Sequence, residues 1–224
     1  MTAGTKKEYV RVKLKGMIFD LDGTLLDTLP VCYMGFRQAL GKHLGREFDE
    51  QAINALFGPS EEGIFKQLVP ENWQACLADY LAAYDQAHPA YARPFPGVEE
   101  ALGLLQERDM RLGIVSGKGP GSMAISLRHS GLGRFFQTVV TGSELGAAKP
   151  VHIRQVLAQW GMPPADAAYI GDTPYDIKSA REVGVLPLGA AWTKTARTKG
   201  MAEKQPAALF AGVDDFVRWI KDNL

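Results

Sequence analysis

Residues 17–28 read Met-Ile-Phe-Asp-Leu-Asp-Gly-Thr-Leu-Leu-Asp-Thr. The apolar run that includes Leu14 predicts a buried strand, which ends on two carboxylates, Asp20 and Asp22. Gly23 permits a tight turn directly after them. Ligands bind at the carboxyl ends of strands in a parallel α/β sheet, and two like charges held together need a counter-ion. The stretch therefore predicts a site for a divalent cation, with Mg2+ as the expected ion. The same residues are also compatible with a plain Asp-Gly turn whose carboxylates are solvated.

Upstream of this stretch, apolar and polar residues alternate between Glu8 and Lys15, with Val10, Val12 and Leu14 as the apolar members. Such alternation is typical of β structure. It predicts that the first strand starts early or is preceded by an edge extension.

Downstream, residues 28–91 contain no convincing strand pattern. Apolar residues at helical spacing predict four helices, with Ser60 as the N-cap of the third. Pro94 and Pro96 then end the helical block. We interpret residues 28–91 as an all-helical insert, a four-helix unit.

From Gly97 onward, helical segments alternate with short apolar runs that predict strands near residues 111–115, 137–141, 167–170, 184–190 and 207–210. Pro187 indicates a position near a sheet edge. Strands that alternate with helices at short spacing predict an α/β fold, a doubly wound, Rossmann-like parallel sheet with helices on both faces. The predicted division is a core domain of residues 1–27 and 92–224 and a helical domain of residues 28–91.

Polar residues follow the strands of this predicted sheet: Asp20 and Asp22, then Ser116 with Gly117, then Lys149 one loop beyond residue 141, then Asp172 with Asp176. Each set alone has an ordinary explanation as a turn, a solvated charge or a helix cap. Together they lie at the carboxyl ends of successive strands, where one pocket would gather them.

The residue types at these positions suit phosphoryl transfer. A carboxylate such as Asp20 can attack phosphorus, and Asp22 can protonate the leaving oxygen and later deprotonate a water. Ser116 and the Gly117 N–H can donate hydrogen bonds to phosphoryl oxygens, and Lys149 can neutralise them. Three roles complete this hypothesis: Asp172 as a metal ligand, Asp176 as an outer-sphere partner or an anchor for Lys149, and Thr24 as a residue that orients Asp22 or contacts phosphate.

These motifs resemble the haloacid dehalogenase-like (HAD) superfamily, over nearly the whole chain: Asp20-Leu-Asp-Gly-Thr, Ser116, Lys149 and Gly171-Asp172-Thr-Pro-Tyr-Asp176. Residues 20–28 are most similar to the phosphoglycolate phosphatase-like branch, and the insert is similar to that family's C1-type cap. The resemblance implies Asp20 as nucleophile, Asp22 as general acid and base, and Ser116 and Lys149 as phosphate binders. It also implies Mg2+ held by Asp20, the Asp22 backbone carbonyl and Asp172. The chain departs from the family pattern at Ser116-Gly117-Lys118, where Thr-Asn or Ser-Ser is more usual.

Composition narrows the function classes. Lys and Arg number 25, Asp and Glu also 25, and 46% of residues are hydrophobic. This balance gives no electrostatic footprint for nucleic acid, and no apolar run is long enough for a membrane span. The opening residues lack the apolar stretch typical of a signal peptide, and Cys32 and Cys76 are interpreted as reduced packing residues. We therefore expect a cytoplasmic protein, a monomer or a homodimer, that acts on a small molecule.

The leading functional hypothesis is a Mg2+-dependent phosphatase that hydrolyses a small phosphorylated metabolite, a phosphoglycolate-like phosphomonoester, through an aspartyl-phosphate. One alternative is a phosphomutase similar to β-phosphoglucomutase, which uses the same two carboxylates. Another is a non-catalytic HAD-fold binding module, which would be expected to lose one of Asp20, Asp22 or Asp172.

Substrate choice is expected to depend on the helical cap. The resemblance places Glu61 and Glu62 near a substrate-facing loop. Arg37, Lys42 and Arg46 could pair with a substrate carboxylate. The preferred interpretation of all five is a solvated helix face.

Overall fold

The computed structural model describes residues 14–224, and within them it contains one six-stranded parallel sheet in the order β3-β2-β1-β4-β5-β6. The strands are β1 (Gly16–Phe19), β2 (Arg111–Val115), β3 (Thr138–Val140), β4 (Ala167–Gly171), β5 (Leu186–Ala190) and β6 (Ala208–Phe210). The predicted α/β class is confirmed. The edge extension predicted before Leu14 lies outside the described residues.

Strand β1 is central because it is buried and apolar along its whole length. It pairs in parallel with β2 on one side and with β4 on the other. Parallel strands covered on both faces are typically continuous apolar runs of this kind. Pro187 lies in β5, one strand in from the edge, and the pairing of β5 with β6 begins only at Leu188. Because β1 pairs in parallel with both β2 and β4, the carboxyl ends of these three strands meet at the same end of the sheet.

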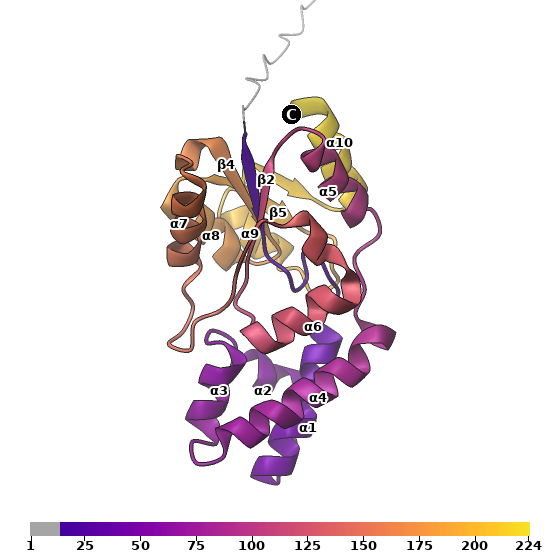
Figure 1. The fold of residues 1–224 in the computed structure, drawn as a ribbon, viewed down its shortest axis with the longest axis vertical. Helices are drawn as coiled ribbons and strands as arrows, with labels where there is room; N and C mark the ends of the chain where they lie inside the picture. Colours follow the sequence, from indigo (N-terminus) through magenta and orange to yellow (C-terminus); the bar gives the residue numbers. More distant parts are fainter. Residues whose placement is uncertain (1–13) are drawn as a thin grey trace, which may run out of the picture.

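Helices cover both faces of the sheet, as a doubly wound fold requires (Figure 1). One face packs on α5 and α10, and the other packs on α7 and α8. The core helices are α5 (Val98–Gln106), α6 (Pro120–Ser130), α7 (Lys149–Trp160), α8 (Pro174–Val183), α9 (Thr198–Glu203) and α10 (Val213–Asn223).

Between β1 and α5 the chain forms four helices and, in the described residues, no named strand: α1 (Leu29–Leu44), α2 (Glu50–Asn54), α3 (Glu61–Leu68) and α4 (Trp73–Tyr91). They share a hydrophobic cluster of their own, built around Phe36, Phe65 and Tyr80, with Ile125 of α6 at its border. Ser60 is the N-cap residue of α3, as predicted, but its hydroxyl makes no cap hydrogen bond. Among residues 14–224, none of the helices is both long and apolar enough to cross a lipid bilayer.

Candidate active site

Asp20 is held in place at the end of β1 by backbone groups. Its N–H donates to the Ile170 carbonyl at 2.9 Å, which continues the sheet ladder, and its Oδ1 accepts from the Leu21 N–H at 2.7 Å. Gly23 follows with φ +74°, and a Cβ there would collide with the Asp172 carboxylate. The turn thus needs glycine for its conformation and for the close approach of the two strand ends.

Lys149, the first residue of α7, joins two of the carboxylates. Its Nζ donates to Asp20 Oδ2 and to Asp176 Oδ1. All three side chains are buried, so this charge is shielded from water. Asp176 thus contacts Lys149 directly, and its role as an anchor for Lys149, one of the two roles expected for it, stays a prediction.

The start of α8 fixes Asp176. Its Oδ2 accepts from the Thr173 N–H at 2.9 Å and the Thr173 hydroxyl at 2.6 Å, while the Thr173 hydroxyl accepts from the Asp176 N–H. This capping box satisfies exposed helix donors and locks the carboxylate rotamer. Tyr169 adds a hydrogen bond to Asp176 Oδ1 at 3.3 Å.

Three buried carboxylates form a cluster suited to a cation. Asp20, Asp172 and Asp176 each offer an oxygen, and these oxygens lie within 4.8 Å of one another. Burial raises the pKa of Asp20 to about 6, against the opposing effect of Lys149. Burial, then Asp176 and Asp20, raise the pKa of Asp172 well above its usual value. When these carboxylates are ionised, the positive charge near them is too small to neutralise them. Hard divalent cations prefer oxygen ligands, so the donor set fits such an ion.

The raised pKa of Asp20 predicts how the metal-free protein responds to pH. An acid whose folded-state pKa lies above its unfolded value adds stability below the unfolded pKa of 3.8, and this stability is lost as pH rises through about 6. We therefore compare the free energy of unfolding of Asp20→Asn with that of wild type at two pH values. The difference should favour the variant more at pH 7 than at pH 4, by up to about 3 kcal/mol. Denaturant unfolding of both proteins in chelator measures the difference, and a pH-independent difference would contradict the shift.

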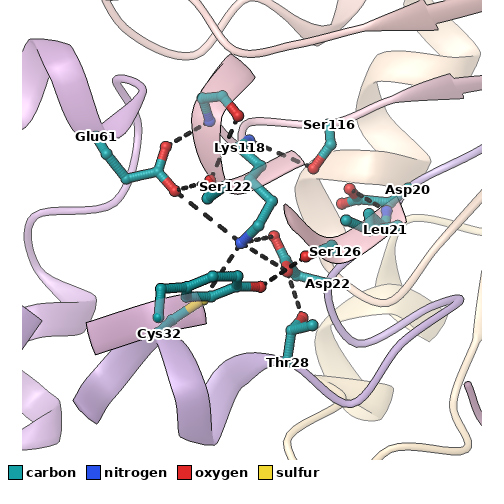
Figure 2. A network of polar contacts seen from close by, with 12 residues as sticks. Asp20, Leu21, Asp22, Thr28, Cys32, Glu61, Ser116, Lys118, Ser122 and Ser126 are labelled. Carbon is teal, nitrogen blue, oxygen red and sulfur yellow. Dashed lines mark hydrogen bonds and ion pairs between the residues drawn. The ribbon is translucent and has the colours of Figure 1, made fainter. Parts of the chain in front are cut away.

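Asp22 lies beside this cluster in a second network, at the junction with the helical insert (Figure 2). Its Oδ1 accepts from the Thr28 hydroxyl and from Lys118 Nζ, the latter at 3.2 Å. The expectation that Thr24 orients Asp22 is wrong, because the Thr24 hydroxyl points to Asp172 Oδ1 at 3.5 Å and Thr28 holds Asp22 instead. A role for Thr24 in phosphate binding stays a prediction.

Lys118 is the residue of this network that sequence reasoning missed. It is only 4% exposed; its Nζ lies 3.5 Å from Cys32 Sγ and 4.4 Å from the centroid of the Tyr84 ring. Burial is the largest single effect on the Lys118 pKa and lowers it. Four neighbouring groups together outweigh burial and raise the pKa well above its usual value: Asp22, Cys32, Tyr84 and Glu61. The departure from the family pattern after Ser116 is the available signal, since a lysine three residues beyond the end of β2 can reach back into the site.

Glu61 of α3 is the second such residue, because the sequence pattern predicts a solvated position for it. It is 6% exposed and reaches from the helical insert to the start of α6. Arg37 and Lys42 are instead exposed and pair with Glu50 and Asp79, as expected of solvated helix faces.

Ser116 and Gly117 directly follow β2, at the same end of the sheet as Asp20. The Ser116 N–H donates to the Val140 carbonyl at 3.2 Å, and Ser116 Oγ accepts from the Lys118 N–H at 3.4 Å. Among residues 14–224 the Ser116 hydroxyl donates to no other group, so it can donate to a ligand. A Cβ added at Gly117 would meet no atom within 4 Å, so a ligand could approach this backbone closely.

Comparison with known proteins identifies a family. The sequence pattern of the haloacid dehalogenase-like hydrolases matches residues 17–190. A relative named pyrophosphatase PpaX, from Listeria welshimeri, is 30% identical over 217 residues, which cover 94% of this chain and 98% of the relative.

Solved structures share the fold. A predicted phosphoglycolate phosphatase from Haemophilus somnus superposes with a TM-score of 0.75 at 20% identity, over 92% of this chain and 97% of that one. A putative β-phosphoglucomutase from Thermotoga maritima gives 0.73 at 20% identity, over 94% and 100%. At these identities the likeness concerns the fold.

Proposed function

Since the chain belongs to the haloacid dehalogenase-like hydrolase family, we propose that it is a Mg2+-dependent phosphatase for a small phosphorylated metabolite, a phosphomonoester of about the size of phosphoglycolate. The observation that carries this proposal is the buried cluster of Asp20, Asp172 and Asp176 with Lys149 at the carboxyl edge of the sheet. Such a cluster suits one ion and one phosphoryl group. The PpaX name of the relatives supports phosphate chemistry of this class.

In the proposed reaction, an oxygen of Asp20 attacks phosphorus while the bond from phosphorus to the leaving oxygen breaks, and Asp22 gives that oxygen a proton. A water then attacks the aspartyl-phosphate; the bond between phosphorus and Asp20 breaks, and Asp22 takes the proton from the water. The Ser116 hydroxyl, the Gly117 N–H and Lys149 bind the phosphoryl oxygens.

Asp20, Asp172 and the Asp22 backbone carbonyl would hold Mg2+, with Asp176 as the anchor that positions Lys149. The ion would supply charge neutralisation for the phosphoryl group during transfer. A second contribution comes from the chain itself, because burial of Asp20 keeps its carboxylate poorly hydrated and therefore reactive.

We propose also that residues 28–91 form a cap domain over a core of residues 1–27 and 92–224. The separate hydrophobic cluster of helices α1–α4 supports these boundaries. Two buried free thiols, Cys32 and Cys76, support a reducing, cytoplasmic location.

The test of the proposed function is phosphate release from a panel of small phosphomonoesters, nucleotides and pyrophosphate, with Mg2+ and with chelator. We expect release that requires Mg2+ and is lost with chelator, because the three carboxylates then repel one another and the phosphoryl oxygens. Release that is equal in chelator would contradict the metal assignment. Transfer of phosphoryl groups between sugar positions without release would favour the phosphomutase alternative.

A further inference from the structure

Glu61 belongs to the helical insert, yet its carboxylate is bound by groups of the core (Figure 2). Its Oε2 accepts from the Gly119 N–H, and its Oε1 accepts from the Ser122 hydroxyl at 2.5 Å. Tyr80 donates to the same Oε1 at 3.1 Å from within the insert. The side chain is thus fixed at the junction, close to the network of Asp22.

Glu62 brings a second carboxylate to the same place. Its Oε2 is buried and, among residues 14–224, has no hydrogen-bond partner. A Cβ at Gly119 would collide with oxygens of both Glu61 and Glu62, which shows that both carboxylates converge on this glycine. A buried acceptor without a donor favours a ligand that brings one.

The charges at this junction do not balance. Lys118 Nζ lies 3.2 Å from Asp22 Oδ1 and 4.0 Å from Glu61 Oε1. Within the described chain, Lys118 is the only cation paired with either of these two carboxylates. Three acidic side chains thus meet at the junction, and the single buried ammonium of Lys118 is shared between two of them. An added anion would meet like charge in a poorly solvated space, where repulsion is strong.

Asp22 is the group proposed to protonate the leaving oxygen, so the leaving group of a bound substrate would lie on this side of the site. We propose that Glu61 and Glu62 determine specificity by charge: they select phosphomonoesters whose leaving group is neutral or cationic and carries a hydrogen-bond donor, and they disfavour leaving groups with a second negative charge. This inference rests on the proposed phosphatase function and narrows its substrate class.

Three substrates with two-carbon leaving groups of similar size test the inference: 2-phosphoglycolate, 2-hydroxyethyl phosphate and phosphoethanolamine, whose leaving groups carry negative, zero and positive charge. Wild type should prefer the neutral and cationic substrates over 2-phosphoglycolate in kcat/KM by about tenfold or more. Glu61→Gln and Glu62→Gln should each reduce this preference by about tenfold, because each removes a charge and keeps the side-chain shape. A ratio of substrates is unaffected by any general weakening of the closed junction, which would slow all three alike.

Glu144→Gln is the matched control. Glu144 is exposed and pairs with Lys66 across the same junction at 2.5 Å, so removal of its charge should leave the preference unchanged. If both Gln variants show the same preference among the three substrates as wild type, the inference is overturned. If wild type hydrolyses none of the three, calorimetric binding of the same compounds to Asp20→Asn in Mg2+ decides the inference: equal affinities overturn it, and weakest binding of 2-phosphoglycolate, relieved by Glu61→Gln, supports it. The proposed function itself fails only if the wider panel of phosphate compounds is not hydrolysed either.

Discussion

Replacing Asp20 by Asn should reduce phosphate release by at least about four orders of magnitude while the protein stays folded. The amide oxygen of Asn is a poor nucleophile, yet it can still accept the Leu21 N–H that positions the carboxylate. Because burial already penalises the charged form of Asp20, the neutral side chain should cost little stability in the metal-free protein. Single-turnover phosphate release and thermal unfolding measure the two effects separately.

Asp166→Asn is the matched control for this variant. Asp166 lies just before β4 and pairs with the exposed Lys15, so the same chemical change there should leave turnover within about twofold of wild type. Residual activity of Asp20→Asn near 10% of wild type, in protein free of deamidation, would contradict the assignment of Asp20 as the nucleophile.

Much of this site could be predicted from sequence because it depends on strand ends. Asp20, Ser116 and Asp172 each follow an apolar run, and parallel pairing of β1 with β2 and β4 brings such positions together whatever the details of packing. Lys149 could be predicted for the same reason, since it opens the helix after β3.

Lys118 and Glu61 could not be predicted in the same way. Their environment depends on how the helical insert meets the core, and the Gly119 to Glu61 hydrogen bond joins residues 58 positions apart. A glutamate on a short polar helix has the pattern of a solvated residue, and only tertiary contact buries it. Thr24 and Thr28 illustrate the same limit at short range, because the turn at Gly23 decides which hydroxyl faces Asp22.

Replacing Lys149 by Met should affect both stability and catalysis. The ammonium is buried between Asp20 and Asp176, with Asp172 in the same cluster, so its loss leaves three carboxylates without their shared cation. Removing one partner of a buried ion pair typically costs about 3–5 kcal/mol of folding free energy. Turnover should fall by about 10^2 to 10^3, because a preorganised positive charge on the phosphoryl oxygens is lost.

Lys15→Met separates these effects from the loss of any lysine. Its partner Asp166 lies at the surface, where an ion pair contributes about 1 kcal/mol or less. Saturating Mg2+ should recover part of the stability of Lys149→Met, since a divalent cation among the same carboxylates relieves their repulsion, but it should not recover turnover, because the phosphoryl oxygens still lack their cationic partner. Full recovery of turnover by Mg2+ would instead mean that Lys149 serves only to balance the charge of the carboxylates, and its assignment as a phosphate binder would be wrong.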